Sequence, residues 1–179
     1  MVVLGQVLVA GDVLEECAPE ERPEGEGSDI VVRRDGQVYF TDPAFGSQQD
    51  SREMDYYGVF HITPKGEVEV VAKWKTRPNG ITLSPNGRAL YVSDSDMRVV
   101  RAFDLDGKGV ATNERLVVEK IPGVPDGLRT DEKGNLYVAA RSVLVYANPV
   151  ERGGGKFLGE VNLADTPTNL AFGDPDMET

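Results

Sequence analysis

The sequence has one cysteine, Cys17, and one histidine, His61, among its 179 residues. A single cysteine excludes an intrachain disulfide, so the chain carries no sign of an oxidising compartment. One histidine and one cysteine also disfavour a zinc site built from nitrogen and sulfur ligands. Serine catalysis would have to use His61, and both the Gly-x-Ser-x-Gly elbow and the Gly-Lys-Ser/Thr phosphate loop are absent. We therefore expect His61 to be a structural or surface residue.

Basic residues are scarce beside acidic ones, because 19 Lys and Arg stand against 30 Asp and Glu, a net charge of −11. This balance argues against binding nucleic acid or an anionic membrane surface. No segment approaches the roughly 20 apolar residues of a membrane span. Residues 1–14 lack the basic start and unbroken apolar run of a signal peptide. The sequence predicts a soluble, cytoplasmic protein whose partners include neither nucleic acid nor membrane.

Helical periodicity is also nearly absent, and short alternating runs rich in β-branched and aromatic residues take its place. One strand-turn-strand unit occurs over residues 28–42, 79–94 and 126–140, and a fourth copy begins at residue 168. Asp-Gly and Asn-Gly pairs in these units supply the positive φ angles of tight hairpins. Successive copies start 51, 47 and 42 residues apart, which matches a propeller blade of about 45 residues.

Each hairpin is followed by two further predicted strands, and four strands make a propeller blade. An immunoglobulin-like sandwich also has short strands, but it does not predict a self-similar motif at this period. The sequence therefore predicts an all-β propeller with blades at about residues 28–76, 77–123 and 124–166, and a partial blade at 167–179. Residues 1–27 would form part of a preceding blade and an acidic loop.

Three blades and parts of two are too few for a closed ring, which usually needs about four to eight. We therefore expect either a partial chain or one that a partner completes. An open array leaves unpaired strand edges, so self-association through open propeller edges is also expected.

The first residue of each copy marks the candidate site, because the innermost strands of a propeller line its channel and their first residues face one mouth. In register these residues are Ser28, Asn79, Asp126 and Thr168. Asn79 and Asp126 each stand between a proline and a glycine. Alone, either tripeptide is an ordinary turn, but two in one register favour a site. Their oxygens suit a hard divalent cation, Ca²⁺ first and Mg²⁺ next.

Two further aspartates, Asp42 and Asp94, close the second strands of the first two hairpins. Aspartate at such positions commonly accepts backbone hydrogen bonds in turns. We expect that role for both residues rather than metal binding.

At these motifs the chain resembles the gluconolactonase and senescence-marker-protein/luciferin-regenerating-enzyme family. Residues 28–46 (Ser-Asp-Ile-Val-Val through Tyr-Phe-Thr-Asp-Pro-Ala-Phe-Gly) are similar to that family's Asn-Asp-x-Val-Val…Tyr-Phe-Thr-Asp-Pro-x-Tyr-Gly. Arg-Pro-Asn-Gly-Ile at 77–81, Val-Pro-Asp-Gly-Leu at 124–128 and Pro-Thr-Asn-Leu-Ala-Phe-Gly at 167–173 resemble its next signatures. The resemblance implies a six-bladed propeller that holds a divalent metal and hydrolyses sugar lactones or related esters.

The resemblance also implies residue roles, because Asn79 and Asp126 match metal ligands and Asp126 matches the proposed general base. The metal would polarise the lactone carbonyl and lower the pKa of a bound water, whose proton Asp126 would take. Ca²⁺ is the expected ion, with Mg²⁺, Mn²⁺ and Zn²⁺ as alternatives. Two departures stand out: Ser28 replaces the family's Asn, and the family's earlier Glu ligand has no counterpart.

Other interpretations stay open at this point. Loss of two ligands, one of them charged, should weaken divalent binding by orders of magnitude. The chain is then alternatively a non-catalytic or inactive propeller fragment that acts as a binding module, or a structural half that associates through its open edges. A strictosidine-synthase-like propeller shares the fold but lacks these metal signatures.

Overall fold

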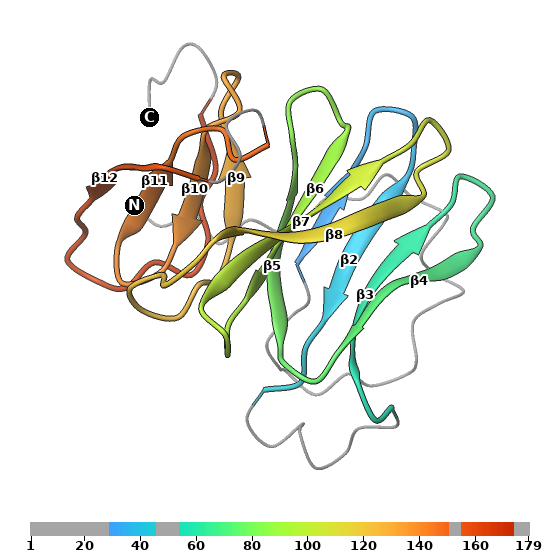
Figure 1. Cartoon of the computed structure of the whole chain (residues 1–179), viewed down its shortest axis with the longest axis horizontal. Helices are drawn as coiled ribbons and strands as arrows, with labels where there is room; N and C mark the ends of the chain where they lie inside the picture. The colour runs from blue at the N-terminus through green and yellow to red at the C-terminus, as the bar shows by residue number, and fades with distance from the viewer. Residues whose placement is uncertain (1–28, 46–53, 151–154, 174–179) are drawn as a thin grey trace.

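The computed structural model describes residues 29–45, 54–150 and 155–173. All regular secondary structure in these ranges is β-strand (Figure 1). The expected all-β fold is thereby confirmed. The first sheet contains β1 (Ile30–Val32), β2 (Val38–Asp42), β3 (Tyr57–Ile62) and β4 (Val68–Trp74). The second contains β5 (Pro78–Leu83), β6 (Ala89–Asp94), β7 (Val99–Leu105) and β8 (Ala111–Val118). The third contains β9 (Leu128–Thr130), β10 (Leu136–Ala139), β11 (Val143–Tyr146) and β12 (Phe157–Val161).

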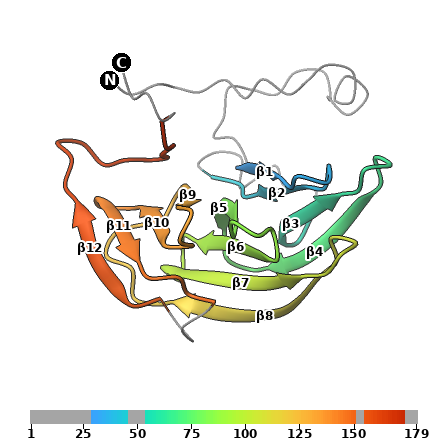
Figure 2. The same ribbon diagram turned by 90° about the horizontal axis from the view of Figure 1, so that it is seen from above.

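Each of the three sheets is antiparallel, and its strands are ordered as they follow along the chain. In Figure 2 the first strands β1, β5 and β9 gather towards the centre, while β4, β8 and β12 form the outer rim. This is the arrangement of propeller blades, and one sheet falls within each range expected for a complete blade. The number of blades in a full ring stays a prediction. Among the described residues, no helix is long and apolar enough to cross a membrane.

The hairpin turns follow from the sequence as expected. Gly36 has φ +88° and its N–H donates to the carbonyl of Arg33, and Gly87 has φ +65° and donates to Ser84. Such left-handed angles are open to glycine at little cost. The fourth copy differs, because residues 167–173 form no strand. This segment instead lies along the third sheet, where the carbonyl of Thr168 accepts a 2.8 Å hydrogen bond from the N–H of Gly127.

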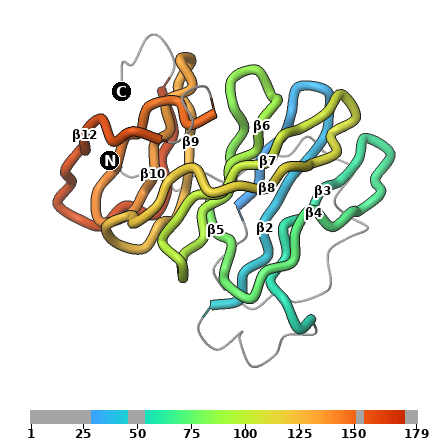
Figure 3. Tube along the Cα trace, in the orientation of Figure 1, coloured from blue at the N-terminus to red at the C-terminus, as the bar shows by residue number. Residues whose placement is uncertain are grey.

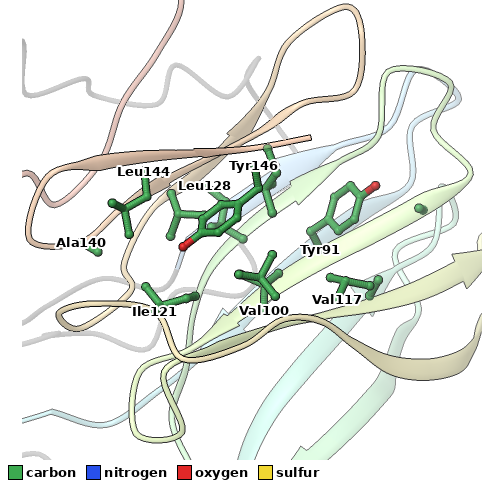
Figure 4. Close-up of a cluster of buried hydrophobic side chains, with 13 residues drawn as sticks. Tyr91, Val100, Val117, Ile121, Leu128, Ala140, Leu144 and Tyr146 are labelled. Carbon is green, nitrogen blue, oxygen red and sulfur yellow. The ribbon is translucent and has the colours of Figure 1, made fainter. Parts of the chain in front are cut away.

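The strands β5, β6 and β7 of the second sheet are buried on both faces, so they lack the usual alternation of apolar and polar residues, whereas half of the β8 residues are exposed. All six residues of β6 are buried. Leu90 and Val92 belong to the cluster shared with the first sheet, whereas Ala89 and Tyr91 belong to the cluster shared with the third. Figure 4 shows the second cluster, which contains Tyr91, Val100, Val117, Ile121, Leu128, Ala140, Leu144 and Tyr146.

The first sheet is attached to the β7–β8 turn by two side-chain hydrogen bonds from β2 and the residue before it. Figure 3 traces the backbone of these segments. Tyr39 donates to the carbonyl of Gly109 at 2.8 Å, and Gln37 donates to the carbonyl of Lys108 at 3.0 Å. His61, opposite Tyr39 in the ladder, stacks on its ring at 4.8 Å and hydrogen-bonds Gln37. Burial raises the pKa of the Tyr39 hydroxyl to about 12. His61 thus has a structural role within the first sheet, where it supports the two residues that bond to the β7–β8 turn.

Candidate metal and active site

Asn79 and Asp126 lie at the same end of neighbouring first strands, and we call this end the mouth. Asn79 is in β5, and Asp126 lies just before β9. The two backbone segments are in direct contact, because an ideal Cβ on Gly80, the residue after Asn79, would lie only 2.0 Å from the carbonyl oxygen of Asp126. The structure thus brings together the segments that carry the two candidates, and their role in a site stays a prediction.

A bulge shapes the chain at Asn79. Pro78 pairs with Asp94 and Ile81 pairs with Val92, so two residues, Asn79 and Gly80, stand against one residue of β6. Bulges of this kind redirect side chains and occur often beside active sites. The Pro-Asn-Gly sequence thus forms an interruption of the ladder rather than a free turn.

Ser95 links the two candidate residues, and its hydroxyl is buried. It accepts a hydrogen bond from Nδ2 of Asn79 at 3.2 Å and donates to the carbonyl of Pro125 at 2.9 Å. Because the amide nitrogen of Asn79 is directed to Ser95, its Oδ1 faces away from that hydroxyl. Asn79 therefore offers an oxygen, the atom that a hard cation requires.

In the first two sheets, a hydroxyl side chain stands one residue before the aspartate that ends the second strand. Thr41 of β2 donates to the carbonyl of Asn79 at 2.6 Å, and Ser93 of β6 donates to the carbonyl of Asp126 at 2.9 Å. Each hydroxyl therefore hydrogen-bonds the backbone carbonyl of the residue that opens the next repeat. Sequence reasoning missed Thr41, Ser93 and Ser95, although the common position of the first two within the repeat was a usable signal.

The close approach at Gly80 yields a test of the geometry. Gly80→Ala would drive a methyl group into the Asp126 carbonyl, a rigid backbone atom. We expect the free energy of unfolding to fall by about 1–3 kcal/mol, the usual cost of overpacking, as measured by urea denaturation. Gly159→Ala in β12 is the control, since nothing lies within 4 Å of its added Cβ; equal losses in both variants would contradict the packing at Gly80.

The other two register positions contribute less to the mouth. Ser28 lies outside the described residues. Thr168 is exposed, and its carbonyl oxygen accepts the hydrogen bond from the N–H of Gly127. The position after each opening residue is Asp29, Gly80, Gly127 and Asn169 in turn.

Among these four residues only Asp29 is charged, and it lies close to the mouth. Its Oδ2 accepts the N–H of Ile81 at 3.1 Å and lies 3.9 Å from Nη1 of Arg129. Burial raises the pKa of the Asp29 carboxyl above its ordinary value, while the Ile81 N–H, Arg129 and the side chain of Asn169 act in the opposite direction.

Asp94 has a structural role, as expected from its position in the turn. Its Oδ1 accepts the N–H of Met97 at 2.9 Å. Its Oδ2 accepts a 2.6 Å bond from the hydroxyl of Thr76 and pairs with Arg101 at 3.2 Å. Asp94 is fully buried, whereas Asp42 in the same register is exposed.

The donor set of the mouth fits a hard divalent cation in kind. Asn79 supplies a carboxamide oxygen and Asp126 a carboxylate, and water or backbone carbonyls commonly complete the 6–8 oxygen ligands of Ca²⁺. Over the part of the chain that the structure describes, no three His, Cys, Asp or Glu side chains gather as a metal cluster. The two candidate side chains therefore supply one amide oxygen and one carboxylate.

A separate groove of about 790 Å³ lies at the other end of the first strands. Its lining comes from the β1–β2, β5–β6 and β7–β8 turns, including Arg33, Asn86 and Asp106. Neither Asn79 nor Asp126 borders it. Its residues carry no catalytic arrangement, so the mouth stays the better candidate.

Residues 8–179 match the family described as SMP-30/Gluconolactonase/LRE-like region. The gluconolactonase of Zymomonas mobilis is 32% identical over 163 residues, which cover 82% of this chain and 45% of that protein. The adipocyte plasma membrane-associated protein of Mus musculus is 32% identical over 137 residues, or 68% of this chain and 31% of that protein.

A gluconolactonase is also among the solved structures with a similar fold. A solved gluconolactonase from Xanthomonas campestris superposes with a TM-score of 0.70 at 29% identity, over 80% of this chain and 49% of that one. The chain thus spans about half the length, or less, of the relatives that it matches.

Proposed function

The chain belongs to the SMP-30/gluconolactonase/LRE-like family, and on this premise we propose that it hydrolyses a sugar lactone at the mouth with a divalent cation. The observation that supports this most is the nearness of Asn79 and Asp126, because Gly80 beside Asn79 touches the Asp126 carbonyl, and Ser95 hydrogen-bonds both Asn79 and the Pro125 carbonyl. The gluconolactonase relatives make a cyclic ester of a sugar acid the substrate class.

Ca²⁺ is the proposed ion, since both donors are oxygens and one of them is a carboxylate. A divalent cation held by Asn79 and Asp126 would act as a Lewis acid on the lactone carbonyl and activate a water molecule. Ser95 contributes by directing the amide nitrogen of Asn79 away from the cation. Thr41 and Ser93 hold the carbonyl groups of Asn79 and Asp126, so neither backbone is free to shift.

Asp126 is the proposed general base. It takes a proton from water as the water oxygen bonds to the lactone carbonyl carbon. The ring C–O bond then breaks, and the proton passes from Asp126 to the departing ring oxygen. The products are the carboxyl group and the hydroxyl group of one open-chain sugar acid, so one water molecule is consumed for each lactone.

Metal removal tests this proposal directly. Hydrolysis of an aldonolactone is followed by proton release, and the uncatalysed rate without protein is subtracted. EDTA treatment should reduce the protein-dependent rate to background, because the two protein ligands alone cannot polarise the carbonyl. Addition of Ca²⁺ should restore the rate, with Mg²⁺, Mn²⁺ and Zn²⁺ compared in parallel.

Two results would contradict the proposal in different ways. A protein-dependent rate that survives EDTA would reject the metal but keep the lactonase. The absence of hydrolysis with every ion, together with no calorimetric binding of Ca²⁺ at millimolar concentration, would favour the alternative of a non-catalytic binding module. Among the described residues, no three His, Cys, Asp or Glu side chains gather as a metal cluster, and this observation keeps the alternative in the test.

A further inference from the structure

Asp29 reaches from the first sheet to the second and binds the strand that carries Asn79. Its Oδ1 accepts the N–H of Ile30 at 3.0 Å, at the start of β1. Its Oδ2 accepts the N–H of Ile81 at 3.1 Å, two residues beyond Asn79 in β5. The side chain is 14% exposed, so these bonds are largely shielded from water.

Thr41 holds the same stretch of β5 from its other end. Its hydroxyl donates to the carbonyl of Asn79 at 2.6 Å. Thr41 and Asp29 also hold each other, since the Thr41 N–H donates to the Asp29 carbonyl at 3.1 Å and the Asp29 N–H donates to Thr41 Oγ1 at 3.2 Å. The first sheet therefore hydrogen-bonds both ends of the segment Asn79–Ile81.

This segment is where the β5–β6 ladder is irregular, so its own sheet does not fix it fully. A backbone that is released from regular pairing needs other partners to hold one conformation. Asp29 and Thr41 are those partners. The direction of the Asn79 side chain thus depends on groups of the preceding sheet.

A carboxylate suits this place better than an amide. Each oxygen of Asp29 faces one N–H donor, from Ile30 and from Ile81. An asparagine has one acceptor oxygen, so its NH₂ group would face one of these N–H groups. Arg129 of β9 lies 3.9 Å from the same carboxylate and adds a favourable charge from the third sheet.

We propose that Asp29 is a positioning residue for the mouth, which fixes the bulge of β5 and thereby the direction of the Asn79 oxygen towards Asp126. This inference rests on the proposed function. Asp29 touches neither cation nor lactone; it acts through the Ile81 N–H and, with Thr41, through the Asn79 backbone. Partners of metal ligands commonly contribute 10- to 100-fold in metal affinity or activity.

The test compares three variants by calorimetric titration with Ca²⁺ and by steady-state kinetics. Asp29→Asn and Thr41→Val should each weaken Ca²⁺ binding about 10- to 100-fold, with a matching loss in kcat/KM. Thr130→Val is the matched control, because the Thr130 hydroxyl donates to the carbonyl of Leu83 at 2.7 Å, at the far end of β5. It also loses one bond between sheets, but its Ca²⁺ affinity should stay that of the unmodified chain.

Unchanged Ca²⁺ affinity in Asp29→Asn, or an equal loss in Thr130→Val, would overturn the inference. If Asp29→Asn fails to fold, Thr41→Val carries the same test. The side-chain NH₂ signal of Asn79 in ¹⁵N-labelled protein separates this inference from the proposed function, because it reports Asn79 without metal. A chain that binds no Ca²⁺ would defeat the proposed function, whereas an Asn79 signal unmoved by both Asp29→Asn and Thr41→Val would defeat the role of Asp29.

Discussion

Replacing Asp126 by asparagine should lower kcat/KM for aldonolactone hydrolysis by about 10²- to 10⁴-fold, the range for loss of a positioned general base. An asparagine keeps one oxygen that can face a cation, but its amide cannot take the proton from water. The measurement is steady-state hydrolysis after EDTA treatment and reloading with Ca²⁺. Asp126→Ala should be at least as slow, since it removes the remaining oxygen as well.

A matched control separates the role of Asp126 from a general effect of charge. Asp165→Asn removes the same charge at an exposed position beyond β12 and should leave the rate unchanged. Calorimetry with Ca²⁺ then divides the loss in Asp126→Asn between weaker metal binding and slower proton transfer. Activity of Asp126→Asn equal to that of the unmodified chain would reject Asp126 as both ligand and base.

Replacing Asp94 by alanine should lower the free energy of unfolding by about 3–5 kcal/mol, because it removes a buried acceptor from three donors at once. Arg101 keeps its pairing with Glu114 at 3.0 Å. Asp94 is 0% exposed and Arg101 is 23% exposed, and the guanidinium of Arg101 also lies over the Trp74 ring at 4.6 Å. The variant further strips the Thr76 hydroxyl and the Met97 N–H of their acceptor. Urea denaturation measures the loss.

The control for Asp94 lies two residues away. Asp96 also pairs with an arginine, Arg77, but at the surface, so Asp96→Ala should lose only about 0.2–1 kcal/mol. The double variant Asp94→Leu/Arg101→Met should recover much of the loss in Asp94→Ala, because apolar groups of similar volume often replace buried ion pairs well. Similar losses in Asp94→Ala and Asp96→Ala would show that burial of the Asp94–Arg101 pair has no energetic weight.

Asp94 also shows how far a repeat in the sequence predicts the structure. Asp42 and Asp94 share one register position and looked equivalent, yet one is exposed and the other is buried. The difference comes from the neighbouring strand. Two residues beyond the partner of Asp94 in β7 stands Arg101, whereas the corresponding residue of β3 is Phe60. A repeat identifies the position, but its environment depends on residues paired across the sheet.

The candidate site was predictable to the same extent. Asn79 and Asp126 were proposed because both open a repeat between proline and glycine, and a propeller brings such positions together. Ser95 and Asp29 were missed because each acts across a boundary between sheets, on Pro125 and on Ile81. These two contacts leave no periodic signal in the sequence, unlike the contacts of Thr41 and Ser93, which cross between sheets from one shared position in the repeat.

The strands and turns were the most predictable part. The Asp-Gly and Asn-Gly turns at Gly36 and Gly87 have the positive φ that the sequence implied. The fourth copy was less predictable, because residues 167–173 keep the sequence motif without forming a strand. A strand needs a partner as well as a pattern, and this segment bonds to Gly127 through one backbone carbonyl.

The burial of β6 on both faces has a consequence for how this molecule can evolve. A residue of β6 has no solvent-facing side to which a new side chain can be directed, so most substitutions there need a compensating change in a neighbouring sheet. Ser93 and Ser95, which hold the two halves of the mouth, lie at the end of this strand. We therefore expect the strand that tolerates substitution least to be the one that supports the mouth, while the exposed outer strands tolerate more changes.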